Sequence, residues 1–145
     1  MTIQDLYDRD FDQWATRNAE LLRSGRLAEI DTEHLAEEIE DMAKRDRREL
    51  FHRLQVLVAR LLKFRCQPAK RSVSWTKTIR AQRDQIELTL DAAPSLKRYA
   101  REVLPLVYPK AVLNAVDDTR LPKSAFPETC PFSLHQILAE DYFPE

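Results

Sequence analysis

The longest helical pattern in the chain is DTEHLAEEIEDMAKRDRRELFHRLQVLVARLLKFR, residues 31–65. Apolar residues recur in it every three or four positions, which is the spacing of one face of an α-helix. Asp46 interrupts this stripe, which consists of Leu35, Ile39, Met42, Leu50, Leu54, Leu57, Leu61 and Phe64. From Leu50 onward Phe51, Val58 and Leu62 add a second apolar row. We therefore expect one helix over residues 33–65, roughly 50 Å long and capped by Asp31 or Thr32. Its first half should be amphipathic and its second half nearly buried.

Shorter helical patterns flank this long one. One helix is expected near residues 9–24, between a cap at Asp8 and Gly25, and another from Ser72 or Ser74 to DAAPS, residues 91–95. A fourth should start at Ser95, be kinked or split at Pro105 and end near Asp118. After a Pro-rich loop at residues 119–132, a short helix is expected in SLHQILAED, residues 133–141. The sequence predicts a single all-α domain over residues 1–145, with five or six helices in a compact bundle around one long central helix.

Composition agrees with this class of fold. The chain has 145 residues with 43% hydrophobic and 32% charged side chains, and it has one glycine and eight prolines, as expected where helices dominate and prolines mark their ends. No apolar run approaches the roughly 20 residues of a membrane span, and the first residues contain no hydrophobic signal core. Cys66 and Cys130 lack metal-binding spacing. We expect a cytoplasmic protein that makes no membrane contact.

Charge is strongly segregated although the net charge is only −1. Residues 1–49 have a net charge of −6, residues 50–83 have nine basic and no acidic residues, and residues 84–145 have a net charge of −4. Basic residues crowd the predicted helix start RSVSWTKTIRAQR, residues 71–83, where the positive end of the helix dipole disfavours cations. A negative group should therefore lie close to this segment.

Three sources of that negative group are open. The first is screening within the chain, by the C-terminal acids Glu128, Glu140 and Asp141 or by pairs of the kind Asp46 could form. The second is an external anion such as phosphate, a nucleotide or an RNA backbone, bound by free backbone N–H groups and nearby side chains. The candidate anion-binding residues are Arg71, Ser72, Ser74, Trp75, Lys77, Arg80 and Arg83. The third is the acidic end of a second copy.

Two spacings on the long helix suggest metal ligands. His34 and Glu38 are one turn apart, and Glu49 and His52 match the Glu-x-x-His spacing of di-iron bundles. His34 and His52 lie roughly 27 Å apart along one helix, so they cannot share an ion. The chain has no GxSxG motif, no Gly-rich phosphate loop and no Cys within four residues of a His. The sequence favours a non-catalytic protein without a cofactor over an enzyme.

Seven segments resemble one bacterial family, Domain of Unknown Function 29: YDRDFDQWA, DTEHLAEEIEDM, LLKFRCQP, RSVSWTKTI, QRDQIE, PSLK and FPETCPF. The chain departs from the family pattern at Ala43 and at Arg120, where the family has glycines. The resemblance implies a compact helical fold in a bacterial cytoplasm and implies no activity.

The leading functional prediction is an interaction or adaptor protein that binds a protein partner or a second copy of itself, with an anion site at the basic helix start. One alternative is an RNA- or nucleotide-binding module that uses the acid-free segment 50–83. It has little support because the pI is near 6.3 and the segment's aromatic residues lie on apolar stripes. A second alternative is a metal-dependent enzyme that uses the His and Glu residues of the long helix.

Overall fold

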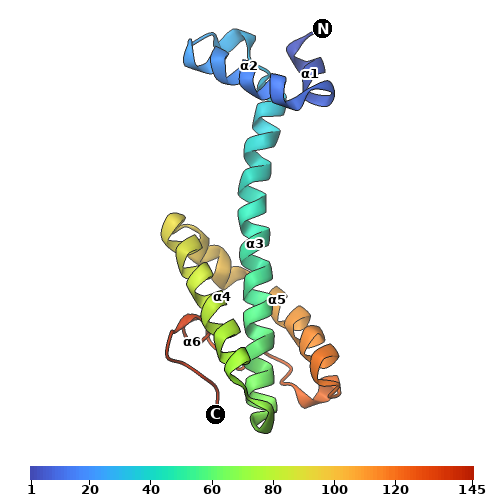
Figure 1. The fold of residues 1–145 in the computed structure, drawn as a ribbon, viewed down its shortest axis with the longest axis vertical. Coiled ribbons are helices and arrows are strands. Elements are labelled where there is room, and N and C mark those ends of the chain that lie inside the picture. Colours follow the sequence, from blue (N-terminus) through green and yellow to red (C-terminus); the bar gives the residue numbers. More distant parts are fainter. The chain divides into compact units, whose positions relative to one another are not determined.

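The computed structural model describes residues 1–145. It contains six α-helices, three short 3-10 helices and no strand (Figure 1), so the predicted all-α class is confirmed. The α-helices are α1 (Ile3–Arg9), α2 (Phe11–Arg23), α3 (Thr32–Cys66), α4 (Val73–Ala92), α5 (Leu96–Thr119) and α6 (Leu134–Leu138). No helix is both long enough and apolar enough to span a membrane.

The chain divides into two compact units, Met1–Arg45 and Asp46–Glu145, and the boundary falls inside the sequence of α3. By residue counts, the first unit has 12 acidic and 6 basic residues, a net charge of −6. The second has 12 acidic and 17 basic residues, a net charge of +5. The division of the structure therefore lies close to the first boundary of the charge segregation, whereas the basic residues 50–83 and the acidic residues 84–145 both belong to the second unit. A single domain over residues 1–145 stays a prediction.

The first unit has a small core. Leu6 and Trp14 are its only buried hydrophobic side chains. The expected helix near residues 9–24 is α2, which begins at Phe11 and is capped by Asp10 rather than Asp8. Gly25, at φ +73°, ends α2 with the paired backbone bonds of a Schellman motif. The sequence analysis missed α1 because a single buried leucine gives no periodic signal.

The second unit has the main core. Figure 1 shows the second half of α3 running between α4 and α5. Leu50, Leu54, Leu57, Leu61 and Leu62 have no exposed surface, as the double apolar row predicted. They pack in one cluster with residues of α4, α5 and α6, including Ile79, Ile86, Val107, Ala111 and Ile137.

Helix α5 corrects one prediction. It is one helix that includes both Pro105 and Pro109, so it is not split at Pro105, one of the two outcomes we expected there. Both prolines are exposed, so the carbonyls that lose their helical partners lie on the solvent side of the helix, where water can bond to them. The helix ends at Arg120, which has a left-handed φ of 59° at the position where the resemblance has a glycine.

The first half of α3 was expected to be amphipathic, and its apolar stripe lies open to solvent: the exposed fractions of Ile39 and Met42 are 65% and 56%. Every residue from Ile39 to Glu49 is exposed. The periodic pattern identified the helix correctly, but no element of the chain covers its apolar side in this stretch.

Candidate functional site

The predicted anion site lies at the start of α4. The Ser72 hydroxyl caps the helix by accepting a hydrogen bond from the Trp75 backbone N–H at 3.3 Å. Ser74, Lys77 and Arg80 are exposed. The expected start of this helix at Ser72 or Ser74 is therefore correct, and the hydroxyl of Ser72 is already used inside the chain.

Arg71 is held by the end of α3 and by the C-terminal tail. Its Nε donates to the Phe64 carbonyl at 2.6 Å, and its Nη2 donates to the Pro144 carbonyl at 3.1 Å. Its guanidinium also lies 4.2 Å from the centre of the Phe64 ring. Phe64 is in the last turn of α3, where carbonyls have no helical partner and the helix dipole is negative. Arg71 therefore caps α3.

Arg83 caps the end of α6, as Arg71 caps the end of α3. Only 4% of it is exposed, and it donates from Nε to the Ile137 carbonyl at 2.8 Å and from Nη2 to the Gln136 carbonyl at 3.2 Å. Burial lowers the pKa of the Arg83 guanidinium, while Asp141 and Tyr142 oppose that shift. Its third nitrogen, Nη1, is buried and has no hydrogen-bond partner.

The C-terminal tail lies against these arginines. The Phe143 ring is 5.3 Å from the Arg83 guanidinium and 5.8 Å from that of Arg80, and it packs 5.4 Å from the Phe64 ring. None of the seven predicted anion-site residues forms an ion pair with a carboxylate. Arg71 and Arg83 thus bond to backbone carbonyls rather than to the C-terminal acids.

Trp75 is partly buried rather than fully inside the core. The Nζ of Lys63 lies 4.9 Å from the centre of its ring and 3.5 Å from a carboxylate oxygen of Asp118. Lys63 is itself 7% exposed. This aromatic side chain therefore covers a buried ammonium group of the chain.

The four candidate metal ligands do not form a cluster. Glu38 accepts a hydrogen bond from Tyr7 at 2.5 Å, and Glu49 pairs with Arg53 at 3.1 Å. His52 is exposed. No three His, Cys, Asp or Glu side chains of the chain are placed to hold a metal ion.

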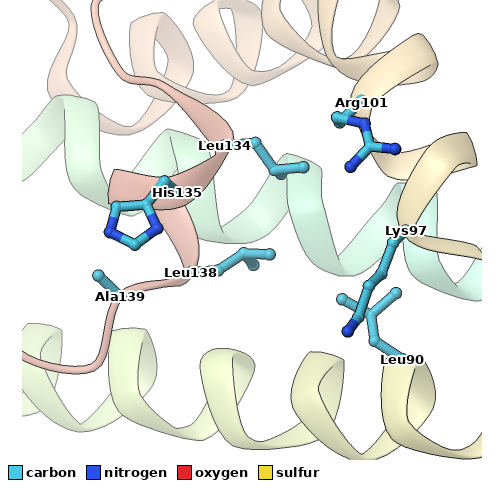
Figure 2. Close-up of a pocket in the computed structure, with 7 residues that line it drawn as sticks. All are labelled: Leu90, Lys97, Arg101, Leu134, His135, Leu138 and Ala139. Atoms are coloured by element: carbon cyan, nitrogen blue, oxygen red, sulfur yellow. The ribbon is translucent and has the colours of Figure 1, made fainter. Parts of the chain in front are cut away.

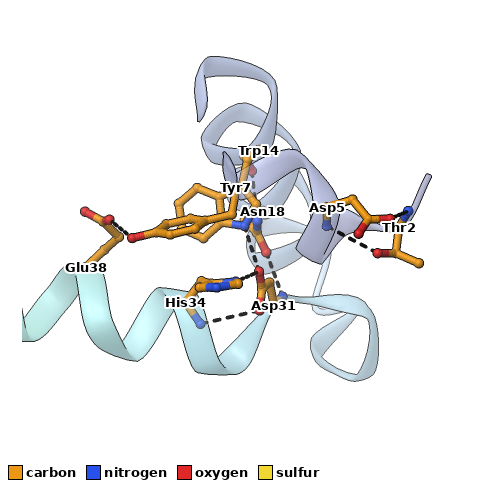
Figure 3. A network of polar contacts seen from close by, with 8 residues as sticks. All are labelled: Thr2, Asp5, Tyr7, Trp14, Asn18, Asp31, His34 and Glu38. Carbon is orange, nitrogen blue, oxygen red and sulfur yellow. Dashed lines mark hydrogen bonds and ion pairs between the residues drawn. The ribbon is translucent and has the colours of Figure 1, made fainter. Parts of the chain in front are cut away.

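His34 instead belongs to a hydrogen-bonded network in the first unit (Figure 3). Its Nδ1 lies 2.6 Å from the Asp31 carboxylate, which also accepts the Trp14 indole N–H at 2.9 Å. The Asn18 side chain accepts from the Asp31 backbone N–H at 2.9 Å. Asp31 and Asn18 are 1% exposed. Burial raises the pKa of Asp31, but hydrogen bonds from Trp14 and His34 outweigh burial and hold it below its usual value.

Tyr7 covers the other side of His34. The two rings stack at a centroid distance of 3.9 Å and an angle of 10°, and the hydrogen bond to Glu38 raises the pKa of Tyr7 to about 12. The hydrogen bond to Asp31 raises the pKa of His34. A buried acid that orients an imidazole can support proton transfer. Through these bonds the network ties α1 and α2 to the start of α3.

A second group of cations lies beside a cavity of about 420 Å³ in the second unit. Figure 2 shows Leu134 and Leu138 of α6 pointing across an open space toward Lys97 and Arg101 of α5, with Leu90 of α4 below Lys97. His135 and Ala139 complete its lining. Neither Lys97 nor Arg101 has an ion-pair partner.

The sequence analysis missed both of these groups. The sequence did contain a feature that could have pointed to the cavity. Between Pro94 and Glu102 there is no acidic residue, so Lys97 and Arg101 lie near a helix start without an acid beside it. Asp31 was identified as a cap, but nothing local to the sequence connects it to Trp14, which lies 17 residues away.

A family model described as Domain of unknown function DUF29 matches residues 6–143, so the chain belongs to this family. No curated protein and no solved structure matches the chain.

Proposed function

Taking membership of a family without an assigned activity as the premise, we propose that this protein is a non-catalytic interaction protein that pairs with a second copy of itself. In the proposed dimer the acidic first unit of one copy binds the basic second unit of the other. The observation that carries the proposal is the uncovered apolar surface of the first unit, on a unit of net charge −6.

Five large hydrophobic side chains of the first unit are more than half exposed: Met1 (77%), Phe11 (51%), Leu27 (61%), Ile39 (65%) and Met42 (56%). Exposed apolar side chains that are neighbours on the surface are typical of interaction sites. Ile39 and Met42 lie three residues apart on α3, on the same side of the helix, so they can dock together onto another surface.

The net charges of the two units indicate which partner binds this surface. Two first units would repel each other, because each has a net charge of −6, whereas the second unit has a net charge of +5. Exposed cations without ion-pair partners are available there, including Lys70, Lys77 and Arg80. Complementary charge steers association and disfavours wrong pairings, and reciprocal contacts between two copies satisfy both units at once.

Sedimentation velocity on the full chain tests the dimer. We expect a dimer at low salt that dissociates as salt is raised, because screening shortens the range of the attraction to about 10 Å at 0.1 M. Replacing Ile39 and Met42 together by Gln should yield a monomer, since both side chains are exposed and the fold does not need them. The matched control is Leu113→Gln on α5, which removes an apolar side chain that is 54% exposed.

Charge reversal separates a specific contact from a damaged fold. Glu33→Lys with Glu40→Lys in the first unit should break the dimer, as should Lys77→Glu with Arg80→Glu in the second. Mixing the two reversed proteins should restore a heterodimer. A monomer at all salt concentrations would overturn the proposal. So would a larger species that nuclease converts to monomer, which would support the RNA-binding alternative instead.

A further inference from the structure

The geometry points to a second binding site, independent of the proposed dimer, in the cavity between α4, α5 and α6. We propose that this cavity binds a small amphiphilic monoanion: one carboxylate group on an alkyl chain. Lys97 and Arg101 bind the charged group, and Leu90, Leu134 and Leu138 contact the alkyl chain.

The cavity has the size and lining of a ligand site. Its volume of about 420 Å³ lies within the range of about 300–1,000 Å³ that is usual for small-molecule pockets. Three leucines from α4 and α6 form its apolar side. Leu90 is almost fully buried, while Leu134 and Leu138 are only partly covered. An alkyl chain in this space would remove apolar surface from water.

A smaller cavity of about 180 Å³ continues this apolar surface. It shares Leu90, Lys97 and Leu138 with the larger one and adds the fully buried Ile86. Arg83 also lines it, and the Nη1 of this 4% exposed arginine is the one buried side-chain nitrogen or oxygen without a hydrogen-bond partner. The two cavities together offer more length than a compact ion needs, which favours a ligand with an extended chain.

Positive potential is concentrated at one side of the larger cavity. Lys97 and Arg101 are four residues apart on α5, so they lie on the same face one turn apart. Lys97 belongs to the first turn, where the helix dipole adds to its charge, and Ser95 makes no capping hydrogen bond. At the start of α4, the side chain of Arg71 bonds to backbone carbonyls, but the side chains of Lys97 and Arg101 form no hydrogen bond or ion pair with the chain.

The ligand should have a single negative charge. The smaller cavity is lined by two cations, Arg83 and Lys97, and by two carboxylates, Glu87 and Asp91, so these charges cancel, whereas Arg101 lines only the larger cavity. A second anionic group at the far end of an alkyl chain would find no net positive charge there to offset its loss of water, which is unfavourable. This arrangement predicts discrimination between a monocarboxylate and a dicarboxylate of equal length.

The test uses decanoate as the probe and the full chain as the protein, with calorimetry for affinity and methyl NMR for location. Decanoate should bind at one saturable site and shift the methyl signals of Leu90, Leu134 and Leu138. Decanedioate and the cation decyltrimethylammonium should bind at least about tenfold more weakly. Lys97→Gln with Arg101→Gln should raise the Kd for decanoate about tenfold, in line with two partly exposed charge contacts.

The matched control is Arg98→Gln, to be compared with Arg101→Gln. Arg98 lies on the same helix, but it is 81% exposed in its side chain, pairs with Glu102 and does not line the cavity. Its replacement should leave the Kd unchanged.

Absence of saturable decanoate binding would overturn the proposal, and so would equal binding of the cationic probe or equal effects of the two single variants. Sedimentation with anionic phosphatidylglycerol vesicles but no binding of monomeric decanoate would also overturn it, in favour of a membrane surface. None of these results depends on the oligomeric state.

Discussion

Helices α4 and α5 begin with similar sequences in different surroundings. Neither has an acidic residue in its first turn, and both have cations close to their start: Arg71 and Lys77 at α4, Lys97 and Arg98 at α5. At α4, Ser72 caps the helix, and Arg71 and Arg83 cap the ends of α3 and α6. At α5, Ser95 makes no capping bond, and Lys97 and Arg101 lie beside a cavity. A cation at a helix start is therefore not a sign of a binding site until its partners in the fold are known.

The difference teaches how an unfavourable local choice is offset. A cation at a helix start costs about 0.3–1 kcal/mol, but a hydrogen bond from a charged donor contributes about 1.5–3 kcal/mol. Arg71, which lies beside the start of α4, donates two bonds to carbonyls, one of them in the last turn of α3. Its tertiary contacts outweigh the local penalty, whereas the side chains of Lys97 and Arg101 at α5 have no such contact. Arg83 lies in the middle of α4, where the dipole penalty does not act, and donates two bonds to carbonyls of α6.

The largest expected effect comes from breaking the contact of Arg83. Arg83→Met keeps the volume but leaves the Gln136 and Ile137 carbonyls without donors, so we expect a loss of about 2–3 kcal/mol in the free energy of unfolding. Urea unfolding of the full chain measures it. Arg101→Met, which removes an arginine from the other helix, should change stability by less than about 0.5 kcal/mol. Equal losses of unfolding free energy in the two variants would show that the hydrogen bonds of Arg83 do not make it more important for stability than Arg101.

Arg71→Gln should have an intermediate effect. It removes the bonds to Phe64 and Pro144 from a partly exposed site, so we expect a loss of about 1 kcal/mol. It should also release the C-terminal tail, which NMR of the Phe143 ring can follow. Lys77→Gln, at an exposed cation of the same helix, serves as the control. A tail that stays in place in the Arg71 variant would mean that Phe143 packing alone holds it.

Supplying the missing acid to α5 should have a smaller effect of opposite sign. Ser95→Asp places a carboxylate at the positive end of the helix near Lys97, and we expect a gain of about 0.5 kcal/mol in unfolding free energy. The same change should weaken decanoate binding, because the new carboxylate competes with the ligand. Greater stability with undiminished decanoate binding would place the ligand's charged group elsewhere.

The start of α3 provides a third case, in which an acid occupies the cap and pairs with a histidine. The fold raises the pKa of His34, so its contribution is complete below about pH 6.5, the usual pKa of histidine, and is lost as pH rises through the folded value. The fold lowers the pKa of Asp31, so its contribution is present above about pH 4 and is lost as pH falls through the folded value. Hydrogen exchange of α2 amides, corrected for the intrinsic pH dependence, should therefore show weaker protection at pH 8 than at pH 6. His34→Gln should abolish this difference, and an unchanged difference would assign it to another group.

Much of the fold follows from local sequence. The boundaries of α3 and α4 were close to those observed, because periodicity, Ser72 and the break at Pro68 act within a few residues. Helix α1 and the continuity of α5 through Pro105 were not predicted, since one depends on a single buried leucine and the other on a proline that faces solvent. The exposure of Ile39 was also missed, because periodicity identifies an apolar face but not what covers it.

The sequence by itself determined the helical class, the long helix and the segregation of charge, because caps, spacing and composition are local properties. Only the tertiary structure decided which cations have partners. Arg83 reaches carbonyls more than 50 residues away in the chain, and Arg71 reaches one 73 residues away. Lys97 and Arg101 are also cations of a helix that begins without an acidic residue, but their side chains bond to no carbonyl. Whether a charge is satisfied depends on distances in space, which the order of residues along a chain does not contain.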